Sequence, residues 1–443
     1  MINCFIPFLS LPQAGQTVRA LRLCDRIKNI YLLATEKIPG EVEGCSILMI
    51  DSFASTATYR TIALHADTAY TLLYTKYTVF EPGQFAFERL LAIAGDTNAG
   101  MLYADRYQVE GGNRKLAPVI DYQKGSLRDD FDFGSLLFFR SSVLKQAVRA
   151  MDADYRFAGL YDLRLRVSEL SELVHVNEYL YSEVETDTRK SGEKLFDYVD
   201  PKNRAVQIEM ESVCTAYLKR VGGYLAPGFE PISFDVDGFE QEASVIIPVR
   251  NRIRTIEDAI RSVLMQETTF RFNLIIVDNH STDGTSEAIE KYTADKRVIH
   301  LIPERFDLGI GGCWNVGVHH PACGKFAVQL DSDDVYSGPD TLQKIVNAFY
   351  EQNCAMVVGT YRMTDFKMNE IPPGIIDHRE WTPDNGRNNA LRINGLGAPR
   401  AFYTPVLRQI NLPNTSYGED YALGLRISRT WQIGRIYDVQ VKI

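Results

Sequence analysis

The sequence lacks the features that mark disulfide-rich, zinc-binding or membrane-spanning proteins. Its 443 residues include only seven cysteines, an odd number, and no two of them form a Cys-x-x-Cys pair. Neither a disulfide framework nor a zinc site is therefore indicated, and a reducing compartment fits best. No apolar run approaches the roughly 18 residues that are needed to cross a bilayer.

A secretory signal is also lacking. The N-terminal segment MINCFIPFLSLPQAG is apolar, but it has neither a basic start nor the small-residue ending of a cleavage site. We therefore expect a cytoplasmic protein, with peripheral attachment to the inner face of a membrane as the alternative.

Positive charge is in short supply. The chain has 48 Lys and Arg against 57 Asp and Glu, a formal net charge of -9. This balance argues against nucleic acid as a partner, because a phosphate backbone is bound by clustered Lys and Arg. The 45% hydrophobic and 24% charged content is typical of a folded globular protein, and the length predicts two or three domains.

The second half of the chain predicts an α/β domain. A β-branched run opens at Val245 and ends at Pro248, and apolar residues at helical spacing follow from Ile256 to Leu264. Further apolar strands are predicted at 274–277, 298–302 and 326–330. This alternation predicts a Rossmann-like, mostly parallel sheet covered by helices, in which ligands bind beyond the carboxyl ends of the strands.

Acidic residues gather at these predicted strand ends. Asp278 follows the second strand, and Asp331, Asp333 and Asp334 follow the fourth in the stretch LDSDD. Adjacent carboxylates on such a loop suit Mg²⁺ or Mn²⁺, which prefer oxygen ligands and keep waters and substrate phosphates in their shell. LDSDD alone could be a solvated acidic loop, but carboxylates arriving at one edge from several strands favour a site.

A segment rich in Gly, Pro and acidic residues, 221–242, predicts a linker between two domains. We place the boundary near residue 235, which gives domains 1–235 and 236–443. The first half has a further helix expected near Asn203 to Lys219. Since the second half has no counterpart, the tail that often completes a metal or acceptor site is expected to be missing.

The first half repeats the second. SSVLKQA at 141–147 matches TPVLRQI at 404–410, and LYDLRLRVSE at 160–169 matches DYALGLRISR at 420–429. We predict two tandem domains of one fold, with chance similarity between two α/β domains as the alternative.

This match has a chemical consequence. Counting back from Pro82 and Pro339 aligns Tyr74 with Asp331, so the first half lacks the acidic loop. Gly159 and Leu160 likewise stand where the second half has Glu419 and Asp420. The first domain is therefore interpreted as a degenerate copy that kept the fold and lost the carboxylates.

From residue 243 onward, five motifs follow one another: VIIPVRN, VDNHSTDGT, GGCWNVG, LDSDD and GEDYALGLR. The ordered set resembles the family 2 glycosyltransferases of the GT-A fold. That resemblance implies an inverting, metal-dependent transferase of the hexosyltransferase type. It would move a sugar from a nucleotide-diphosphate sugar to a hydroxyl of a glycan or lipid-linked acceptor, in polysaccharide biosynthesis. The implied Mg²⁺ or Mn²⁺, held at the DXD-type motif LDSDD, would neutralise charge on the departing diphosphate.

The resemblance also implies a nucleotide-binding set. Pro248, Val249 and Arg250 would lie against the base, and Asp278 and Asn279 would bind the base and its surroundings. Arg250 stands where tyrosine is frequent in the family, and Asn279 where a second aspartate is frequent. Since asparagine both donates and accepts hydrogen bonds, the choice among uridine, thymidine and guanosine donors stays open.

The remaining implied roles concern the ribose, the metal and the transfer step. Asp331 would contact the ribose, and Asp333 would bind the metal with Asp334 close enough to exchange roles. Asp420 would be the general base, which its ionisation at neutral pH allows, and Glu419 would orient the acceptor or Asp420. A helix N-cap is the alternative for Asp420.

Two other functions are weighed against the transferase. A non-catalytic carbohydrate-binding or scaffold protein built from two such domains has little need for all of Asp331, Asp333 and Asp420. A nucleotidyltransferase would need a Gly-rich basic loop after the first strand, which is missing. The acceptor would be selected around residues 362–399, where the candidate residues are Trp381, Asn394, Gly395 and Gly397. Trp314 could stack on a sugar or base, or belong to the core.

Overall fold

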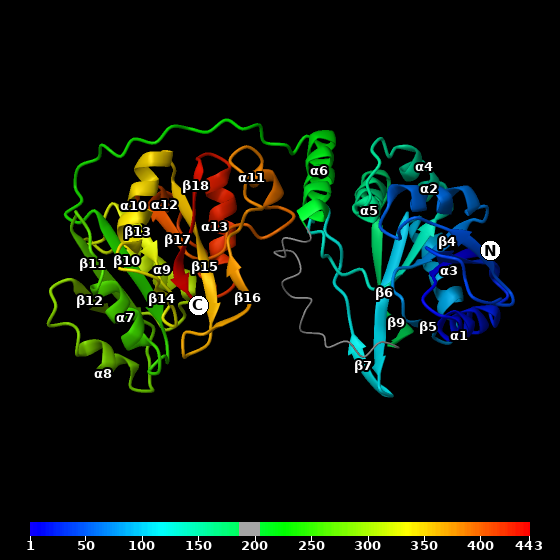
Figure 1. Cartoon of the computed structure of the whole chain (residues 1–443), viewed down its shortest axis with the longest axis horizontal. Helices are drawn as coiled ribbons and strands as arrows, with labels where there is room; N and C mark the ends of the chain where they lie inside the picture. The colour runs from blue at the N-terminus through cyan, green and yellow to red at the C-terminus, as the bar shows by residue number, and fades with distance from the viewer. Residues whose placement is uncertain (186–203) are drawn as a thin grey trace. The chain divides into compact units, whose positions relative to one another are not determined.

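The computed structural model describes residues 1–185 and 204–443, which form two compact units, Met1–Gly223 and Tyr224–Ile443 (Figure 1). The division falls ahead of the expected boundary near residue 235. The reason is that the segment before that point already belongs to the second core, where Ile232 and Phe234 pack. Within the described ranges, none of the helices combines the length and the hydropathy of a membrane-spanning segment.

In the first half of unit 2, strands and helices alternate as predicted. Its strands are β10 (Ala243–Val249), β11 (Phe272–Asp278), β12 (Val298–Leu301), β13 (Phe326–Gln329), β14 (Val335–Tyr336), β15 (Met356–Thr364), β16 (Glu370–Ile376), β17 (Arg400–Tyr403) and β18 (Ile433–Lys442). Its helices are α7 (Ile256–Leu264), α8 (Thr285–Glu290), α9 (Ile310–His319), α10 (Thr341–Gln352), α11 (Gly386–Asn389), α12 (Thr404–Ile410) and α13 (Glu419–Ser428). The helix predicted at 256–264 is confirmed by α7.

Unit 1 has a similar succession of elements, but its described residues include no counterpart of α8 or α11, and a helix follows its last strand. Its strands are β1 (Ile2–Pro7), β2 (Ile27–Ala34), β3 (Ser46–Met49), β4 (Tyr70–Tyr74), β5 (Val79–Pro82), β6 (Met101–Glu110), β7 (Asn113–Ala117), β8 (Leu136–Arg140) and β9 (Leu173–Val184). Its helices are α1 (Leu11–Arg22), α2 (Thr56–His65), α3 (Ala86–Thr97), α4 (Ser141–Arg149), α5 (Gly159–Leu170) and α6 (Arg204–Val221). The expected helix near 203–219 is α6, although Asn203 lies outside the described residues.

The two sheets have identical strand orders. They run β3-β2-β1-β4-β8-β6-β9-β5 with β7 beside β6, and β12-β11-β10-β13-β17-β15-β18-β14 with β16 beside β15. Both units are therefore α/β domains of one GT-A-like topology in tandem. In each unit the central strands are buried on both faces, which explains their continuous apolar runs: in β4, Leu72 and Tyr74 belong to one core cluster and Leu73 to another.

The sheets are mixed rather than mostly parallel. In unit 2, β10 pairs in parallel with β11 and β13, as the βαβ pattern predicts. However, β17 lies antiparallel between β13 and β15. The predicted alternation covered only the first four strands, and β17 is reached through a long connection that contains only the short helix α11. This inserted strand brings its first residue to the edge where the parallel strands end.

Strand pairing also corrects the alignment of the two units. Cys4 and Val245 are equivalent, because they precede Pro7 and Pro248 by the same number of residues. Cys4 pairs with Leu72 and Val245 pairs with Val328, so Leu72 corresponds to Val328. Extending both strands places Thr75, not Tyr74, opposite Asp331. The alignment counted back from Pro82 and Pro339 is therefore wrong by one residue, because the segments between strand and helix differ in length in the two units.

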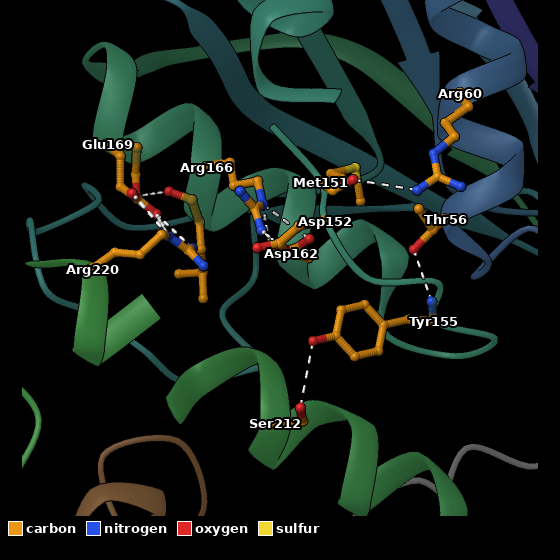
Figure 2. Close-up of polar contacts among 12 residues, drawn as sticks. Thr56, Arg60, Met151, Asp152, Tyr155, Asp162, Arg166, Glu169, Ser212 and Arg220 are labelled. Atoms are coloured by element: carbon orange, nitrogen blue, oxygen red, sulfur yellow. Dashed lines mark hydrogen bonds and ion pairs between the residues drawn. The ribbon is translucent and has the colours of Figure 1, made fainter. Parts of the chain in front are cut away.

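Helix α6 is attached to unit 1 through polar contacts with the loop before α5 and with α5 itself (Figure 2). The Glu209 carboxylate accepts hydrogen bonds from the backbone N–H groups of Phe157 at 2.7 Å and Ala158 at 3.2 Å. Arg220 donates to Glu169, and the Tyr155 hydroxyl lies 3.5 Å from that of Ser212. An acidic side chain of α6 therefore fills the N-terminus of α5, the position at which α13 begins in unit 2.

Candidate active site

In unit 2 a cavity of about 380 Å³ opens where β10, β11 and β13 end. The predicted site residues that line it are Pro248, Val249, Arg250, Asn279, Asp331, Asp333, Glu419 and Asp420. Because the carboxyl ends of parallel strands meet at one edge, segments far apart in the sequence converge there. Asp278 and Asp334 are buried and do not line this cavity.

Asp278 is fully buried behind the cavity wall, where it organises the loop after β11. Its carboxylate accepts hydrogen bonds from the Ser281 N–H at 3.0 Å and from the Ser286 hydroxyl, and it lies 3.4 Å from Nε2 of His300. Burial alone would raise the pKa of this carboxyl, but the hydrogen bonds from His300, Ser281 and Ser286 outweigh it and lower the pKa well below its usual range.

The adjacent Asn279 does face the cavity. Its side-chain amide donates to the Leu308 carbonyl at 2.9 Å, and its backbone N–H donates to Val249 at 2.8 Å. The side-chain oxygen is buried and has no hydrogen-bond partner among the described residues. Buried acceptors are normally paired, so this unpaired oxygen marks Asn279 as a candidate to bind a ligand in the cavity that it lines.

The partly buried His300 should make the stability of the protein depend on pH. Its contact with Asp278 raises its pKa against the opposing effect of burial, and Glu290 adds to the rise. A histidine whose pKa is raised in the folded state stabilises that state fully below the unfolded pKa of about 6.5. This stabilisation is lost as the pH rises through the folded-state pKa. The loss of melting temperature in His300→Gln should therefore be largest below this pH and shrink as the pH increases.

Melting curves of wild type and variant across the pH range measure this difference. His319→Gln is the matched control, because its Nε2 contacts the uncharged amide of Asn411. An effect of His300→Gln that stays constant, or grows with pH, contradicts the prediction.

The acidic loop after β13 holds three carboxylates in different environments. Asp333 is exposed, and its Oδ2 lies 3.5 Å from Nε of Arg252. Asp331 is half-buried and accepts from the Gln329 amide at 3.0 Å. Asp334 is buried, and burial, together with the charges of Asp331 and Asp333, raises its pKa to about 8.

Crowded carboxylates that raise one another's pKa are the environment that a divalent cation relieves. The ligand set is oxygen alone, which fits Mg²⁺ or Mn²⁺. The oxygens of Asp331, Asp333 and Asp334 do not all lie within 4.8 Å of one another in the described structure. The residues therefore fit a cation that takes one or two protein ligands and completes its shell with water and phosphate.

Arg400, which no sequence motif indicated, lines the same cavity as Asp420. Its Nη1 and Nη2 lie 2.6 and 2.5 Å from Oδ2 of Asp420. The other oxygen, Oδ1, accepts the Tyr421 N–H at 2.7 Å. The N-cap of α13 is Gly418, so the alternative that Asp420 caps this helix is wrong. Arg400 carried no usable signal, because β17 itself was not predicted.

Glu419 opens α13 beside Asp420. It is buried, with Oε2 lacking a hydrogen-bond partner among the described residues. Burial raises the pKa of its carboxyl, and the charge of Asp420 adds to this effect. A buried acceptor atom next to Asp420 suits the expected role of orienting either a hydroxyl or that residue.

Two walls of the cavity are joined by a clasp, formed by residues 307–319 and 411–415. Gly309 N–H donates to the Asn414 side chain at 2.8 Å, and Gly311 N–H donates to the Thr415 carbonyl at 3.0 Å. Asn315 exchanges two hydrogen bonds with the backbone of Leu412, at 2.8 and 2.9 Å. The motif GGCWNVG is thereby explained: a Cβ on Gly311 would lie 2.0 Å from the Pro413 carbonyl oxygen.

The acceptor candidates do not reach this cavity. Trp381 is buried with Gly386 against its ring, and Asn394 is exposed elsewhere. The lining of the cavity includes neither of them, nor Gly395 or Gly397. Trp314 is likewise buried against Phe402, which confirms the core alternative for that residue.

Comparison with known proteins gives both sequence and structural relatives. Among the structures, Staphylococcus aureus TarS 1–349 in complex with UDP-GlcNAc is 21% identical with a TM-score of 0.38, covering 46% of this chain and 58% of that chain. The mannosyltransferase PcManGT of Pyrobaculum calidifontis, in complex with GDP-Man and Mn²⁺, is 19% identical with a TM-score of 0.37, covering 54% and 66%.

The sequence relatives are closer. An uncharacterized glycosyltransferase of Rickettsia felis is 32% identical over 200 residues, 44% of this chain and 32% of that protein, so the chain spans about a third of its length. The putative teichuronic acid biosynthesis glycosyltransferase TuaG of Bacillus subtilis is 33% identical over 185 residues, 42% of this chain and 71% of TuaG. The model of Glycosyl transferase family 2 matches residues 244–409, the stretch that supplies most of the cavity. The chain thus belongs to glycosyl transferase family 2.

Proposed function

We propose that the chain is an inverting, metal-dependent glycosyltransferase that moves a sugar from a nucleotide-diphosphate sugar to a hydroxyl of a glycan or lipid-linked acceptor. The observation that carries this proposal is one cavity lined by the acidic loop, by Asn279 and by Asp420. A binding protein has no need of a carboxylate base beside a cation loop. TuaG is named for teichuronic acid biosynthesis, which supports a role in polysaccharide biosynthesis.

The donor would lie along the edge of β10 and β11. Pro248, Val249 and Arg250, which line the cavity, would flank the base, and the unpaired side-chain oxygen of Asn279 would accept a hydrogen bond from it. Asp278 would act from behind, through the loop that it organises. Asp331 would accept a hydrogen bond from a ribose hydroxyl.

Asp333 would hold the cation, and Asp334, which is buried just outside the cavity lining, would share this role if it turned toward the cavity. When bound, Mg²⁺ or Mn²⁺ would neutralise the charge that develops on the leaving diphosphate. Asp420 would accept the proton of the acceptor hydroxyl while the hydroxyl oxygen attacks the anomeric carbon from the face opposite the diphosphate. The new C–O bond forms as the bond to the diphosphate breaks, so the configuration inverts and a nucleoside diphosphate leaves.

Unit 1 is proposed to be a degenerate copy that binds the acceptor or organises assembly. Thr75, Lys76 and Tyr77 follow β4 in place of the acidic loop, and the Lys76 ammonium pairs with buried Glu183 at 2.7 Å. Glu209 closes the helix terminus that corresponds to the start of α13. We further propose that the protein acts in the cytoplasm, either free or peripherally attached to the inner face of the membrane.

Thermal melting with nucleotides tests the proposal. UDP, TDP, GDP and ADP are added with and without Mn²⁺ to wild type and to Asp333→Ala. A millimolar ligand with micromolar Kd stabilises the folded state by about 4 kcal/mol. One diphosphate should raise the melting temperature of wild type with Mn²⁺ only, and Asp333→Ala should lose this effect.

The matched control is Asp340→Ala, which removes a nearby exposed aspartate that pairs with Lys344 outside the cavity. It should respond to nucleotide as wild type does. If no nucleotide shifts the melting temperature of the wild type, the transferase proposal falls and the carbohydrate-binding or scaffold alternative takes its place.

A further inference from the structure

Arg400 is a buried cation in a place where the fold does not require one. It is the first residue of β17, and its side chain is 8% exposed. Because β17 runs antiparallel to β13, its first residue stands beside the carboxyl end of β13, next to the acidic loop. The guanidinium contributes to the cavity lining together with Asp331 and Asp420.

The contact between Arg400 and Asp420 fixes the carboxylate at both oxygens. Both Nη atoms meet Oδ2, while Oδ1 accepts the N–H of Tyr421. The positive charge of Arg400 also counteracts the burial that raises the pKa of Asp331, Asp334 and Glu419. One arginine thus orients a single carboxylate directly and offsets the charge of the others at a distance.

Unit 1 shows what the fold does without this pair. Met101 pairs with Phe139 as Met356 pairs with Phe402, so Leu137 corresponds to Arg400. Met101 also pairs with Leu173 as Met356 pairs with Ile433, and helices α5 and α13 begin at equal distances before these partners. Leu160 therefore corresponds to Asp420.

Both members of the ion pair are leucine in unit 1. Leu137 belongs to a core cluster there, and Leu160 packs against the same cluster. Two apolar side chains satisfy these positions in the shared topology. Burying an arginine beside a partly exposed aspartate therefore costs desolvation without structural need. The pair is present in the unit with the acidic loop and replaced as a pair in the other.

We propose that Arg400 is a positioning residue for the transfer step. Resting on the proposed function, this assigns Arg400 the task of holding the Asp420 carboxylate where it can receive the proton of the acceptor hydroxyl. Arg400 then acts through Asp420, and donor binding does not depend on it.

The test compares Arg400→Leu, Arg400→Lys and the double variant Arg400→Leu/Asp420→Leu, which reproduces the unit 1 pair. The first measurement is the rate of nucleoside diphosphate release from UDP-N-acetylglucosamine, UDP-glucose and GDP-mannose with Mn²⁺ and water as acceptor. The second is the affinity for UDP and GDP with Mn²⁺. The third is the crystal structure of Arg400→Leu.

Arg400→Leu should lower kcat by about 100-fold, the loss in rate expected when a general base is misplaced. The affinity for diphosphate should stay within about threefold of wild type. Arg400→Lys should recover part of this loss, because an ammonium can still meet Oδ2. The double variant should fold and melt above Arg400→Leu, which leaves Asp420 unpaired. The Asp420 carboxylate should turn away in the crystal structure of Arg400→Leu.

Arg387→Leu is the matched control. It removes a second buried guanidinium of unit 2, one that donates to the Gly228 carbonyl outside the cavity, and it should leave kcat unchanged. Unchanged kcat in Arg400→Leu overturns the inference, as does an unmoved Asp420 in its crystal structure. Loss of diphosphate affinity also overturns it, because Arg400 would then bind the donor. A wild type that binds no diphosphate and releases none instead overturns the proposed function itself.

Discussion

Replacing Asp420 with asparagine is expected to lower the rate of sugar transfer by about 10²- to 10⁴-fold, the usual contribution of a general base. An amide cannot accept the proton of the acceptor hydroxyl. Its oxygen can still accept the hydrogen bonds of Arg400, and its size is unchanged, so the cavity should keep its shape. The measurement is the release of nucleoside diphosphate at saturating donor, together with the affinity for diphosphate and Mn²⁺.

The pattern of the two parameters decides the role of Asp420. A fall in kcat with unchanged affinity is the signature of an interaction made in the transition state. Glu419→Gln is the matched comparison, since it alters the neighbouring carboxylate with the same change of chemistry, and its smaller expected loss would reflect orientation alone. If Asp420→Asn transfers sugar at the rate of wild type, the base must be sought elsewhere in the cavity.

The second large effect is on stability. Asp278→Ala is expected to reduce the free energy of unfolding of unit 2 by about 3–5 kcal/mol, the usual cost of removing one partner of a buried charge pair. The substitution leaves the raised-pKa imidazole of His300, the N–H of Ser281 and the hydroxyl of Ser286 without their acceptor. Urea unfolding followed by tryptophan fluorescence measures the change.

A matched surface variant separates this cost from the general effect of losing an aspartate. Asp295 is 33% exposed and pairs with Arg297, so Asp295→Ala should cost about 1 kcal/mol or less. A comparably small cost for Asp278→Ala would mean that the loop after β11 is not held by this carboxylate. Direct contact between Asp278 and a base would then regain support.

Sequence patterns predicted the fold correctly where the signal was local. The apolar runs ending at Pro248, Asp278 and Asp331 set the strands and their order along one edge, because β-branched runs alternate there with helically spaced residues. Eight of the ten predicted site residues consequently line one cavity, a placement that follows from parallel topology alone. The roles assigned to them stay predictions.

Sequence patterns did not predict the features that depend on pairing between distant segments. Strand β17 is four residues long and lies between strands formed by earlier segments, so nothing in its own sequence announces Arg400 as a partner of Asp420. The one-residue error at Tyr74 has a related cause, since register is set by cross-strand hydrogen bonds rather than by counting from prolines. Trp381 was chosen for its chemistry, but burial removes it from any acceptor.

The clasp between residues 307–319 and 411–415 has a kinetic consequence. It ties the wall that carries Leu308 and Ile310 to the wall that carries Ser416 and Glu419, so neither can swing as a separate lid. These loops lose their conformational entropy when the protein folds, so ordering them adds no further cost when a ligand binds. Donor association should consequently proceed in a single phase whose rate rises linearly with concentration, as for a preformed pocket.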